Sequence, residues 1–322
     1  MIDQIRKPIE NEFRMYEAAF EEAVKTDNKL LANILRYVRT TKGKELRPVL
    51  TLLSAKLLGD VDSDTIKAAV SLELLHTASL MHDDVVDQTY ERRSKYSVNA
   101  LWNNKIAILV GDYYLSKSAE ISAQMKSRRG TPLLARLGCD LADGELLQVS
   151  NESKLVIDEP DYLDVIKKKT AQTFAFCTQA GAISVNASSA DEEKLRLFGE
   201  YLGMIFQMKD DIFDYFESGD IGKPTGNDLK EGKMTLPLIF ALQHADKSET
   251  KPILNMIRNK DFSTEKLKNM SKFVQVRGGI EYTEKRMQDF KVMALDILKD
   301  FPESIAKMAM SDCLDFAMLR SK

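Results

Sequence analysis

Residues 68 to 87 of the chain are AAVSLELLHTASLMHDDVVD, a nearly continuous apolar stretch that ends in three aspartates. Apolar character over this length is typical of a helix buried at the centre of a protein. On such a helix Asp83 and Asp87 would share one face, with Asp84 on an adjacent face. Carboxylates are seldom left in an apolar context unless a cation compensates them. The stretch therefore predicts a buried helix that ends in a cation site.

The same acidic pattern returns as DDIFD at Asp210 to Asp214. Mg²⁺ prefers hard oxygen ligands and usually takes one or two carboxylates together with water and substrate phosphates. We therefore expect metal ions between two facing helices, where they would clamp a diphosphate. One such motif alone would more often be a solvated acidic helix face, but each copy here closes an apolar run. A calcium-binding loop is disfavoured, because neither motif has alternating Asp or Asn residues and a central glycine.

The composition of the chain favours an all-α protein. Its 322 residues include only 15 Gly and 8 Pro, and 44% are hydrophobic, which is enough for a large core. Helical spacing is found at residues 5–23, 27–39, 65–87, 104–126, 132–150, 160–186 and 191–216. No alternating strand pattern persists, and nothing between the two acidic motifs resembles a linker. We expect a single domain spanning residues 1–322.

Charge and cysteine content exclude several classes of protein. A net charge of -3, from 46 basic and 49 acidic residues, provides no general basic surface for nucleic acid. Cys139, Cys177 and Cys313 lie far apart and indicate neither a disulfide framework nor a zinc site. No run approaches the roughly 18 apolar residues that span a membrane, and the N-terminus lacks the apolar stretch of a secretory signal. A cytoplasmic protein is expected.

Basic residues accompany the acidic motifs. Arg92 and Arg93 follow the first motif, Lys44 and Arg47 stand at a helix entrance, and Lys223 and Lys233 lie in a loop after the second motif. Arginine offers forked donors to phosphate oxygens, whereas lysine supplies a compact charge. Any one of these residues alone would most often form a surface ion pair of little consequence. Their placement beside carboxylates indicates an anionic ligand such as a diphosphate.

Eight segments, in order along the chain, resemble the trans-isoprenyl diphosphate synthases, specifically the long-chain polyprenyl type. They are GKELRP at 43–48, LELLHTASLMHDDVVD at 72–87, ERR at 91–93, NALWNNKIAILVGDYYLS at 99–116, GELLQ at 144–148, KKTA at 168–171, FQMKDDIFDY at 206–215 and GKPTGNDLKEGKMTLP at 222–237. The resemblance implies an all-helical bundle around a deep central cavity, a homodimer, and both aspartate motifs at the cavity mouth. Ser94 stands where members commonly have glycine, which bears on the local loop conformation.

The resemblance also implies roles for residues at matching positions. Asp83, Asp84, Asp87, Asp210, Asp211 and Asp214 would hold Mg²⁺ against an allylic diphosphate. Arg92, Lys169, Thr170, Gln207 and Lys233 would contact that diphosphate, and Arg92, Lys169 and Lys233 would be catalytic. Lys44, Arg47, His76 and Arg93 match the isopentenyl diphosphate site, and Lys223 would approach the phosphates. Without the resemblance, His76 and Gln207 would more often be hydrogen-bonding groups of the core.

The implied activity is prenyl transfer. The allylic diphosphate, farnesyl by preference, ionises, isopentenyl diphosphate attacks the cation, and a proton is lost, with released diphosphate as the base. Residues 217–237 are a candidate lid that excludes water. A non-catalytic subunit of a heteromeric synthase is disfavoured because both acidic motifs are complete. A terpene cyclase would need no isopentenyl site, and a structural metal-binding protein would need no paired basic sites.

Product length depends on the helix before Asp83. A helix advances about 5.4 Å per turn, similar to one isoprene unit, so successive turns can each form the floor for a growing chain. Ala78 and Ser79 stand where short-chain members carry bulky side chains, and Leu75 and Leu72 lie deeper. The first motif also lacks the two-residue insertion of bacterial farnesyl enzymes. We expect octaprenyl diphosphate for a quinone side chain, released through transient membrane contact, with a geranylgeranyl product as the alternative.

Overall fold

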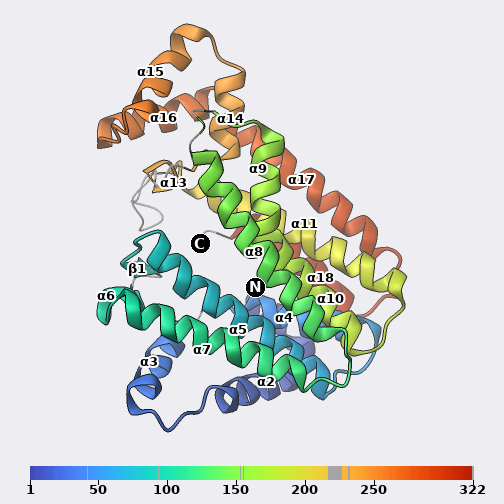
Figure 1. Cartoon of the computed structure of the whole chain (residues 1–322). Helices are drawn as coiled ribbons and strands as arrows, with labels where there is room; N and C mark the ends of the chain where they lie inside the picture. The colour runs from blue at the N-terminus through green and yellow to red at the C-terminus, as the bar shows by residue number, and fades with distance from the viewer. Residues whose placement is uncertain are drawn as a thin grey trace. The chain divides into compact units, whose positions relative to one another are not determined.

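The computed structural model describes residues 1–41, 43–92, 95–152, 154, 156–216, 227–230 and 233–320. Within these residues the regular structure is helical, apart from a short antiparallel hairpin in which β1 pairs with β2 (Figure 1). The all-α fold predicted from the sequence is therefore confirmed. None of the described helices is both long enough and apolar enough to cross a membrane.

The elements up to the second aspartate motif are α1 (Ile2–Arg6), the 3-10 helix η1 (Lys7–Ile9), α2 (Glu10–Ala23), α3 (Lys29–Thr40), α4 (Leu46–Leu58), α5 (Ser63–Val86), β1 (Glu91–Arg92), β2 (Lys95–Tyr96), α6 (Val98–Leu101), α7 (Asn104–Ala123), α8 (Gly130–Glu152), α9 (Glu159–Ile166), the π-helix η2 (Lys167–Ala171), α10 (Gln172–Ser184) and α11 (Ser189–Phe213). They are followed by α13 (Asn227–Lys230), α14 (Leu236–Gln243), α15 (Lys247–Arg258), α16 (Thr264–Val276), α17 (Gly279–Leu298) and α18 (Ile305–Leu319).

Two of the expected helices are interrupted. The helix expected at 5–23 is broken by η1, where Pro8 has no backbone N–H to donate. The helix expected at 160–186 is α9, then η2, then α10. A π-helical turn such as η2 is frequent at functional sites, and this one contains the KKTA segment.

The first compact unit consists of Met1–Cys139, Thr173–Gly199 and Ile297–Asp312. Within it α5 packs along α7, α4 and α2 (Figure 1). Gly111 on α7 permits the close approach of α5, because a Cβ there would lie 2.3 Å from Nε2 of His82. The apolar stretch 68–87 is thus a helix packed on several sides, as predicted.

The second compact unit consists of Asp140–Gln172, Glu200–Asp296 and Cys313–Lys322. Here η2 packs directly on α11, since a Cβ on Gly203 would lie 2.5 Å from the Cα of Ala171. This packing sets the KKTA segment beside the turn of α11 that precedes the second aspartate motif. That residues 1–322 form a single domain stays a prediction, as does the facing arrangement of the two motif helices.

Candidate active site

The first aspartate motif forms the last turn of α5, and its three carboxylates have different surroundings. Asp83 and Asp87 are half-buried, whereas Asp84 is buried. Arg92, at the start of the hairpin, donates from Nε to Oδ1 of Asp84 at 2.8 Å and also forms an ion pair with it. Burial raises the pKa of Asp84, although the nearby Arg92 opposes the shift. The middle aspartate is therefore tied to Arg92.

Thr89, just before β1, and Asn99 of α6 hold the end of α5 through its backbone. The carbonyl of Asp84 accepts from the backbone N–H of Thr89 at 2.9 Å and from Nδ2 of Asn99 at 3.1 Å. Asn99 also donates to the carbonyl of Thr89. Asn99, the first residue of the segment at 99–116, thus helps to fix the first motif.

A pocket adjoins the first motif within the first unit. It contains about 780 Å³ of space not filled by atoms, part of it open solvent. His76, Leu80 and Asp84 line it from α5, and Arg92 lines it from the hairpin. The structure thus brings His76 and Arg92, both predicted to bind diphosphates, to one pocket with a motif aspartate.

Lys44, in the loop before α4, and Arg47, the second residue of α4, lie on either side of Glu45, which has an unusual backbone conformation. Glu45 is in the left-handed conformation, with φ 48°, and is the N-cap of α4. Its carboxylate is buried and lies 3.6 Å from Nη1 of Arg39. Left-handed backbone is rare for residues other than glycine, asparagine and aspartate. Glu45 was not predicted as a site residue, because nothing in the neighbouring sequence indicates this conformation.

Arg47 lies in the first turn of α4, and its guanidinium is 5.4 Å from the centroid of the Phe174 ring on α10. Lys44 is exposed, and its backbone carbonyl accepts from Nη2 of Arg6 at 2.5 Å. Their predicted role in binding isopentenyl diphosphate stays a prediction.

The residues predicted to set product length lie along α5. Leu75 and Ser79 share a stripe with Asp83, since they precede it by eight and four residues. Ala78 is 2% exposed and lies one position away from that stripe. Ser79 donates from Oγ to the carbonyl of His76 at 3.0 Å. Of these residues, Leu75 and Ser79 are on the side of the helix that presents Asp83.

The second aspartate motif forms the end of α11. Asp211 is 4% exposed. Tyr162 of α9 donates its hydroxyl to Oδ2 of Asp211 at 2.6 Å, and Nε2 of Gln207 donates to Oδ1 at 2.7 Å. Burial raises the pKa of Asp211 to about 7, against the opposing effect of these two hydrogen bonds. A further hydrogen bond links Thr170 to this group, because its hydroxyl donates to Oε1 of Gln207 at 2.7 Å. The predicted residues Thr170, Gln207 and Asp211 are thus brought together.

Asp210, the first aspartate of this motif, forms an ion pair with the guanidinium of Arg320. Its side chain is 44% exposed and lies 3.0 Å from Nη2 of Arg320. Arg320 also donates to the carbonyl of Phe206 at 2.6 Å and lies 3.6 Å from the centroid of that ring. Asp214 accepts from the backbone N–H of Asp228 at 3.2 Å. Tyr162 and Arg320 both escaped the sequence analysis, since each lies far from the motif in sequence.

Lys169 is held by the GELLQ segment. Its ammonium lies 2.5 Å from a carboxylate oxygen of Glu145 and donates to Oε1 of Gln148 at 2.8 Å. A Cβ on Gly144 would lie 3.1 Å from the backbone nitrogen of Lys169, so this glycine lets α8 approach η2 closely. The GELLQ segment of α8 and the KKTA segment of η2 therefore pack against each other.

Three of the predicted positions fall outside the described residues. They are Arg93, Ser94 and Lys223, and most of the candidate lid at 217–237 also lies outside the described residues. Lys233 is half-buried, and its backbone N–H donates to the carbonyl of Asp228 at 2.7 Å. Its catalytic role stays a prediction.

The donor set fits a magnesium ion that shares its ligands with a substrate. In the part of the chain that the structure describes, no group of three or more His, Cys, Asp or Glu side chains is arranged to hold a metal by itself. Mg²⁺ commonly takes only one or two protein carboxylates, with water and phosphate oxygens as the other ligands. Asp83 and Asp87, four residues apart on α5, can supply two hard oxygen donors in one direction.

The helical fold, the paired aspartate motifs and the basic side chains around them define a class of enzymes that act on diphosphates. A family model described as "Polyprenyl synthetase" matches residues 28–274, and the chain belongs to this family. It is 32% identical over 310 residues to an octaprenyl diphosphate synthase of Haemophilus influenzae, covering 96% of this chain and 94% of that protein. The chain is therefore a trans-prenyltransferase.

Two solved structures extend the comparison. A polyprenyl synthase from Caulobacter crescentus, complexed with calcium and isoprenyl diphosphate, has a TM-score of 0.94 and 29% identity, covering 100% of this chain and 98% of that one. A geranylgeranyl pyrophosphate synthase from Bacteroides thetaiotaomicron has a TM-score of 0.86 and 40% identity, covering 99% of each chain. The relatives thus include synthases named for a long prenyl product, octaprenyl, and for a shorter one, geranylgeranyl.

Proposed function

We propose that the chain condenses isopentenyl diphosphate head-to-tail onto farnesyl diphosphate, producing an all-trans octaprenyl diphosphate for a quinone side chain. The pocket beside the first motif is the observation that carries this proposal, because it presents His76, Arg92 and Asp84 together. The likeness to an octaprenyl diphosphate synthase supports the product.

Mg²⁺ is the proposed cofactor, and the exposed or half-buried aspartates are its proposed direct ligands. These are Asp83, Asp87, Asp210 and Asp214. Bound there, the metal would neutralise diphosphate oxygens as the allylic carbon–oxygen bond breaks. The buried Asp84 and Asp211, which the resemblance also assigned to the metal, would anchor the helix ends through Arg92 and Tyr162. The calcium in the Caulobacter crescentus structure supports a hard divalent ion.

The cationic side chains would bind and orient the substrates. Arg92 and Lys169 would contact the allylic diphosphate, and the ion pair with Glu145 would hold Lys169 in place. Lys44, Arg47 and His76 would hold isopentenyl diphosphate near the allylic carbon, which converts a bimolecular step into an effectively unimolecular one. Arg93, Lys223 and Lys233 complete the proposed set.

The protein is further proposed to be a cytoplasmic homodimer that binds no nucleic acid and touches membranes only to release its product. Its mass in solution, measured by sedimentation with and without substrates, tests the dimer. Partition of the labelled product into vesicles, with and without the protein, tests the membrane contact.

A shorter product is the second candidate. The 40% identity to the geranylgeranyl pyrophosphate synthase from Bacteroides thetaiotaomicron supports this candidate. Both candidates share the same chemistry and differ only in where elongation stops.

One incubation tests the function and the product. The purified chain is mixed with farnesyl diphosphate, labelled isopentenyl diphosphate and Mg²⁺, and the dephosphorylated products are separated by chromatography. Incorporation of five labelled units into farnesyl diphosphate would match octaprenyl, and one would match geranylgeranyl. No incorporation by the chain alone, with activity restored by a second protein, would point to a subunit of a heteromeric synthase. Consumption of farnesyl diphosphate without isopentenyl diphosphate would indicate a cyclase.

A further inference from the structure

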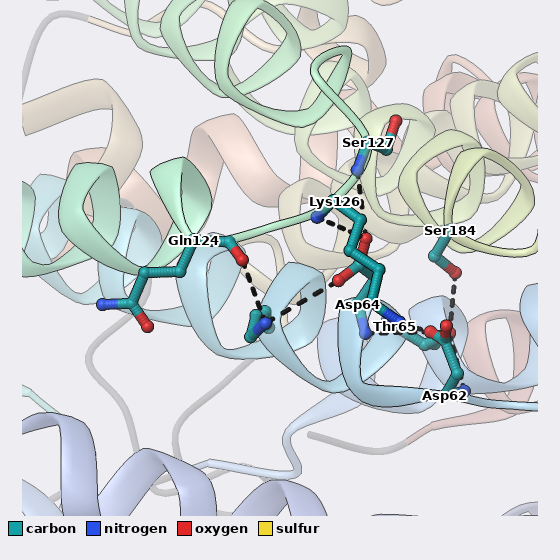
Figure 2. Close-up of polar contacts among 8 residues, drawn as sticks. Asp62, Asp64, Thr65, Gln124, Lys126, Ser127 and Ser184 are labelled. Carbon is teal, nitrogen blue, oxygen red and sulfur yellow. Dashed lines mark hydrogen bonds and ion pairs between the residues drawn. The ribbon is translucent and has the colours of Figure 1, made fainter.

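The helices α4 and α5 start in different ways. The residue before α5 is Asp62, which has an extended backbone, and its carboxylate accepts from the backbone N–H groups of Asp64 and Thr65 at 2.8 and 3.1 Å (Figure 2). Both features are typical of the residue before a helix. The residue before α4 is Glu45, which has φ 48° and ψ 42° and whose side chain forms no capping hydrogen bond. Glu45 therefore does not cap α4 as Asp62 caps α5.

The place of this left-handed residue in the fold is unusual too. Among the residues that the structure describes, Gln88, Asn186 and Lys260 are the other non-glycine residues with positive φ. Each of these three is exposed and lies just beyond the end of a helix, where a single left-handed residue is common. Glu45 instead precedes a helix, and its side chain is buried. Because a Cβ makes left-handed backbone unfavourable, Glu45 needs contacts that hold it in this conformation.

The guanidinium of Arg39 provides such a contact. Nη1 of Arg39 lies 3.6 Å from Oε1 of Glu45, and the side chain of Glu45 is only 3% exposed. A buried carboxylate is costly unless a cation compensates it, so the ion pair favours the conformation in which the two groups meet. Rotation of Glu45 out of the left-handed region would turn its Cβ, and with it the carboxylate, away from Arg39.

Arg39 is itself held by α2. It lies in the last turn of α3, its guanidinium is 4.7 Å from the centroid of the Phe20 ring, and its Nη2 donates to Oε1 of Glu21 at 3.4 Å. Contact with an aromatic face and with a second carboxylate restricts a side chain that is otherwise long and flexible. The ion pair therefore connects the start of α4 to two earlier helices of the first unit.

The two cations on either side of Glu45 are those proposed to bind isopentenyl diphosphate. Lys44 precedes it, and Arg47 lies in the first turn of α4. A left-handed residue turns the chain sharply, so the backbone of Glu45 sets the direction of Lys44 relative to Arg47. Glu45 and Arg39 also line the pocket that His76 lines. The turn is therefore part of the wall of that pocket.

We propose that Arg39 and Glu45 are positioning residues for isopentenyl diphosphate: their ion pair keeps the chain left-handed at Glu45, and this turn orients Lys44 and Arg47 towards one diphosphate. The inference rests on the proposed function, which assigns that substrate to Lys44 and Arg47. The rival account is that Arg39 contacts the substrate directly, since it lines the same pocket. Glycine separates the two accounts, because it adopts the left-handed conformation without help from a side chain.

The first test measures the KM for isopentenyl diphosphate at saturating farnesyl diphosphate and Mg²⁺. Glu45→Ala removes the carboxylate but keeps the Cβ, and should raise this KM by about tenfold, the factor by which a Cβ disfavours left-handed backbone. Arg39→Gln should raise it similarly. The KM for farnesyl diphosphate should not change in either variant. Arg36→Gln is the matched control and should leave both values unchanged, because Arg36 is an exposed arginine of α3 that hydrogen-bonds to Asn33.

The second test is rescue by glycine. Glu45→Gly removes the same carboxylate as Glu45→Ala but also the Cβ, so its KM for isopentenyl diphosphate should be several-fold lower than that of Glu45→Ala. Arg39→Gln combined with Glu45→Gly should have the KM of Glu45→Gly alone, because the turn then no longer depends on the ion pair. Melting temperatures show which variants fold, and if Arg39→Gln does not, the comparison of alanine with glycine decides.

Three results would overturn the positioning role. One is an equally raised KM in Glu45→Ala and Glu45→Gly, which would show that the left-handed turn is not the cause. Another is a double variant as impaired as Arg39→Gln, which would mean that Arg39 binds the substrate itself. The third is an unchanged KM in Glu45→Ala with normal isopentenyl consumption. No isopentenyl consumption by the unsubstituted protein would instead overturn the proposed function, and this inference with it.

Discussion

The two aspartate motifs have the same spacing but different surroundings. In the first, the buried middle residue Asp84 is paired with the cation of Arg92. In the second, the buried middle residue Asp211 is bound by the neutral donors of Tyr162 and Gln207. The pKa of both carboxyls is raised by burial, but only for Asp84 does a cation oppose the shift. Spacing thus selects which face a carboxylate occupies, while residues outside the motif determine how its charge is balanced.

The first residues of the motifs differ too. Asp83 is half-buried at the end of α5, whereas Asp210 is 44% exposed and lies 3.0 Å from Arg320. A cation therefore contacts the middle carboxylate of one motif and the first carboxylate of the other. If the exposed members bind metal and the buried ones anchor the helix, substitutions at the two kinds of position should have different consequences.

The largest effect is expected from Asp83→Asn. It removes a proposed metal ligand, and losing one group that stabilises charge in a transition state costs roughly 10²–10³ in turnover. Turnover of labelled isopentenyl diphosphate at saturating Mg²⁺ measures this, and the melting temperature should stay close to that of the unsubstituted protein. Turnover within a factor of two would remove Asp83 from the metal site.

Next in size is the pH dependence of stability caused by Asp211. Its pKa is about 7 in the folded protein, above the ordinary value of 3.8, so the folded state binds the extra proton between these values. The unfolding free energy should therefore fall as pH rises from about 4 to about 7, by an amount on the order of 4 kcal/mol at most. Asp211→Asn should flatten this dependence in metal-free thermal melts. Identical pH profiles for the two proteins would show that Asp211 is not buried in this way.

A smaller loss is expected from Tyr162→Phe. It removes one hydrogen bond to a buried carboxylate, worth about 2 kcal/mol, and should lower the denaturant midpoint. Tyr282→Phe is the matched control in the same unit, because the Tyr282 hydroxyl donates to Glu159 at 2.6 Å but Tyr282 is half-buried. Only Tyr162→Phe should also raise the Mg²⁺ concentration needed for half-maximal turnover. The same rise in both variants would argue against a specific role for Tyr162.

The smallest effect is expected from Arg320→Gln. Removal of a positive charge beside a half-exposed carboxylate should tighten cation binding, by about 1 kcal/mol or several-fold in affinity. Mg²⁺ titration of the free protein by calorimetry measures this. Weaker binding would mean instead that Arg320 orients Asp210 for the metal.

Much of this arrangement could be predicted from sequence, because it depends on positions within one helix. The periodicity of residues 68–87 predicts α5, and the four-residue spacing places Asp83 and Asp87 on one face. The resemblance grouped Thr170, Gln207 and Asp211 at one diphosphate, and the structure joins them by hydrogen bonds.

Other parts depend on contacts between residues far apart in sequence, which spacing does not reveal. Arg320 is 110 positions from Asp210, and Tyr162 reaches Asp211 from a separate helix. Glu45 has a left-handed backbone and a buried ion pair with Arg39. The neighbouring sequence indicates neither of these features.

The most direct test of the division between exposed and buried aspartates is the turnover of Asp210→Asn and Asp211→Asn, measured side by side over a range of Mg²⁺ concentrations. Asp210→Asn should lose roughly 10²–10³ in turnover at every concentration, because it removes a direct ligand. Asp211→Asn should keep measurable turnover and need more Mg²⁺ to reach it. Equal losses in the two variants, with both proteins folded, would contradict the division.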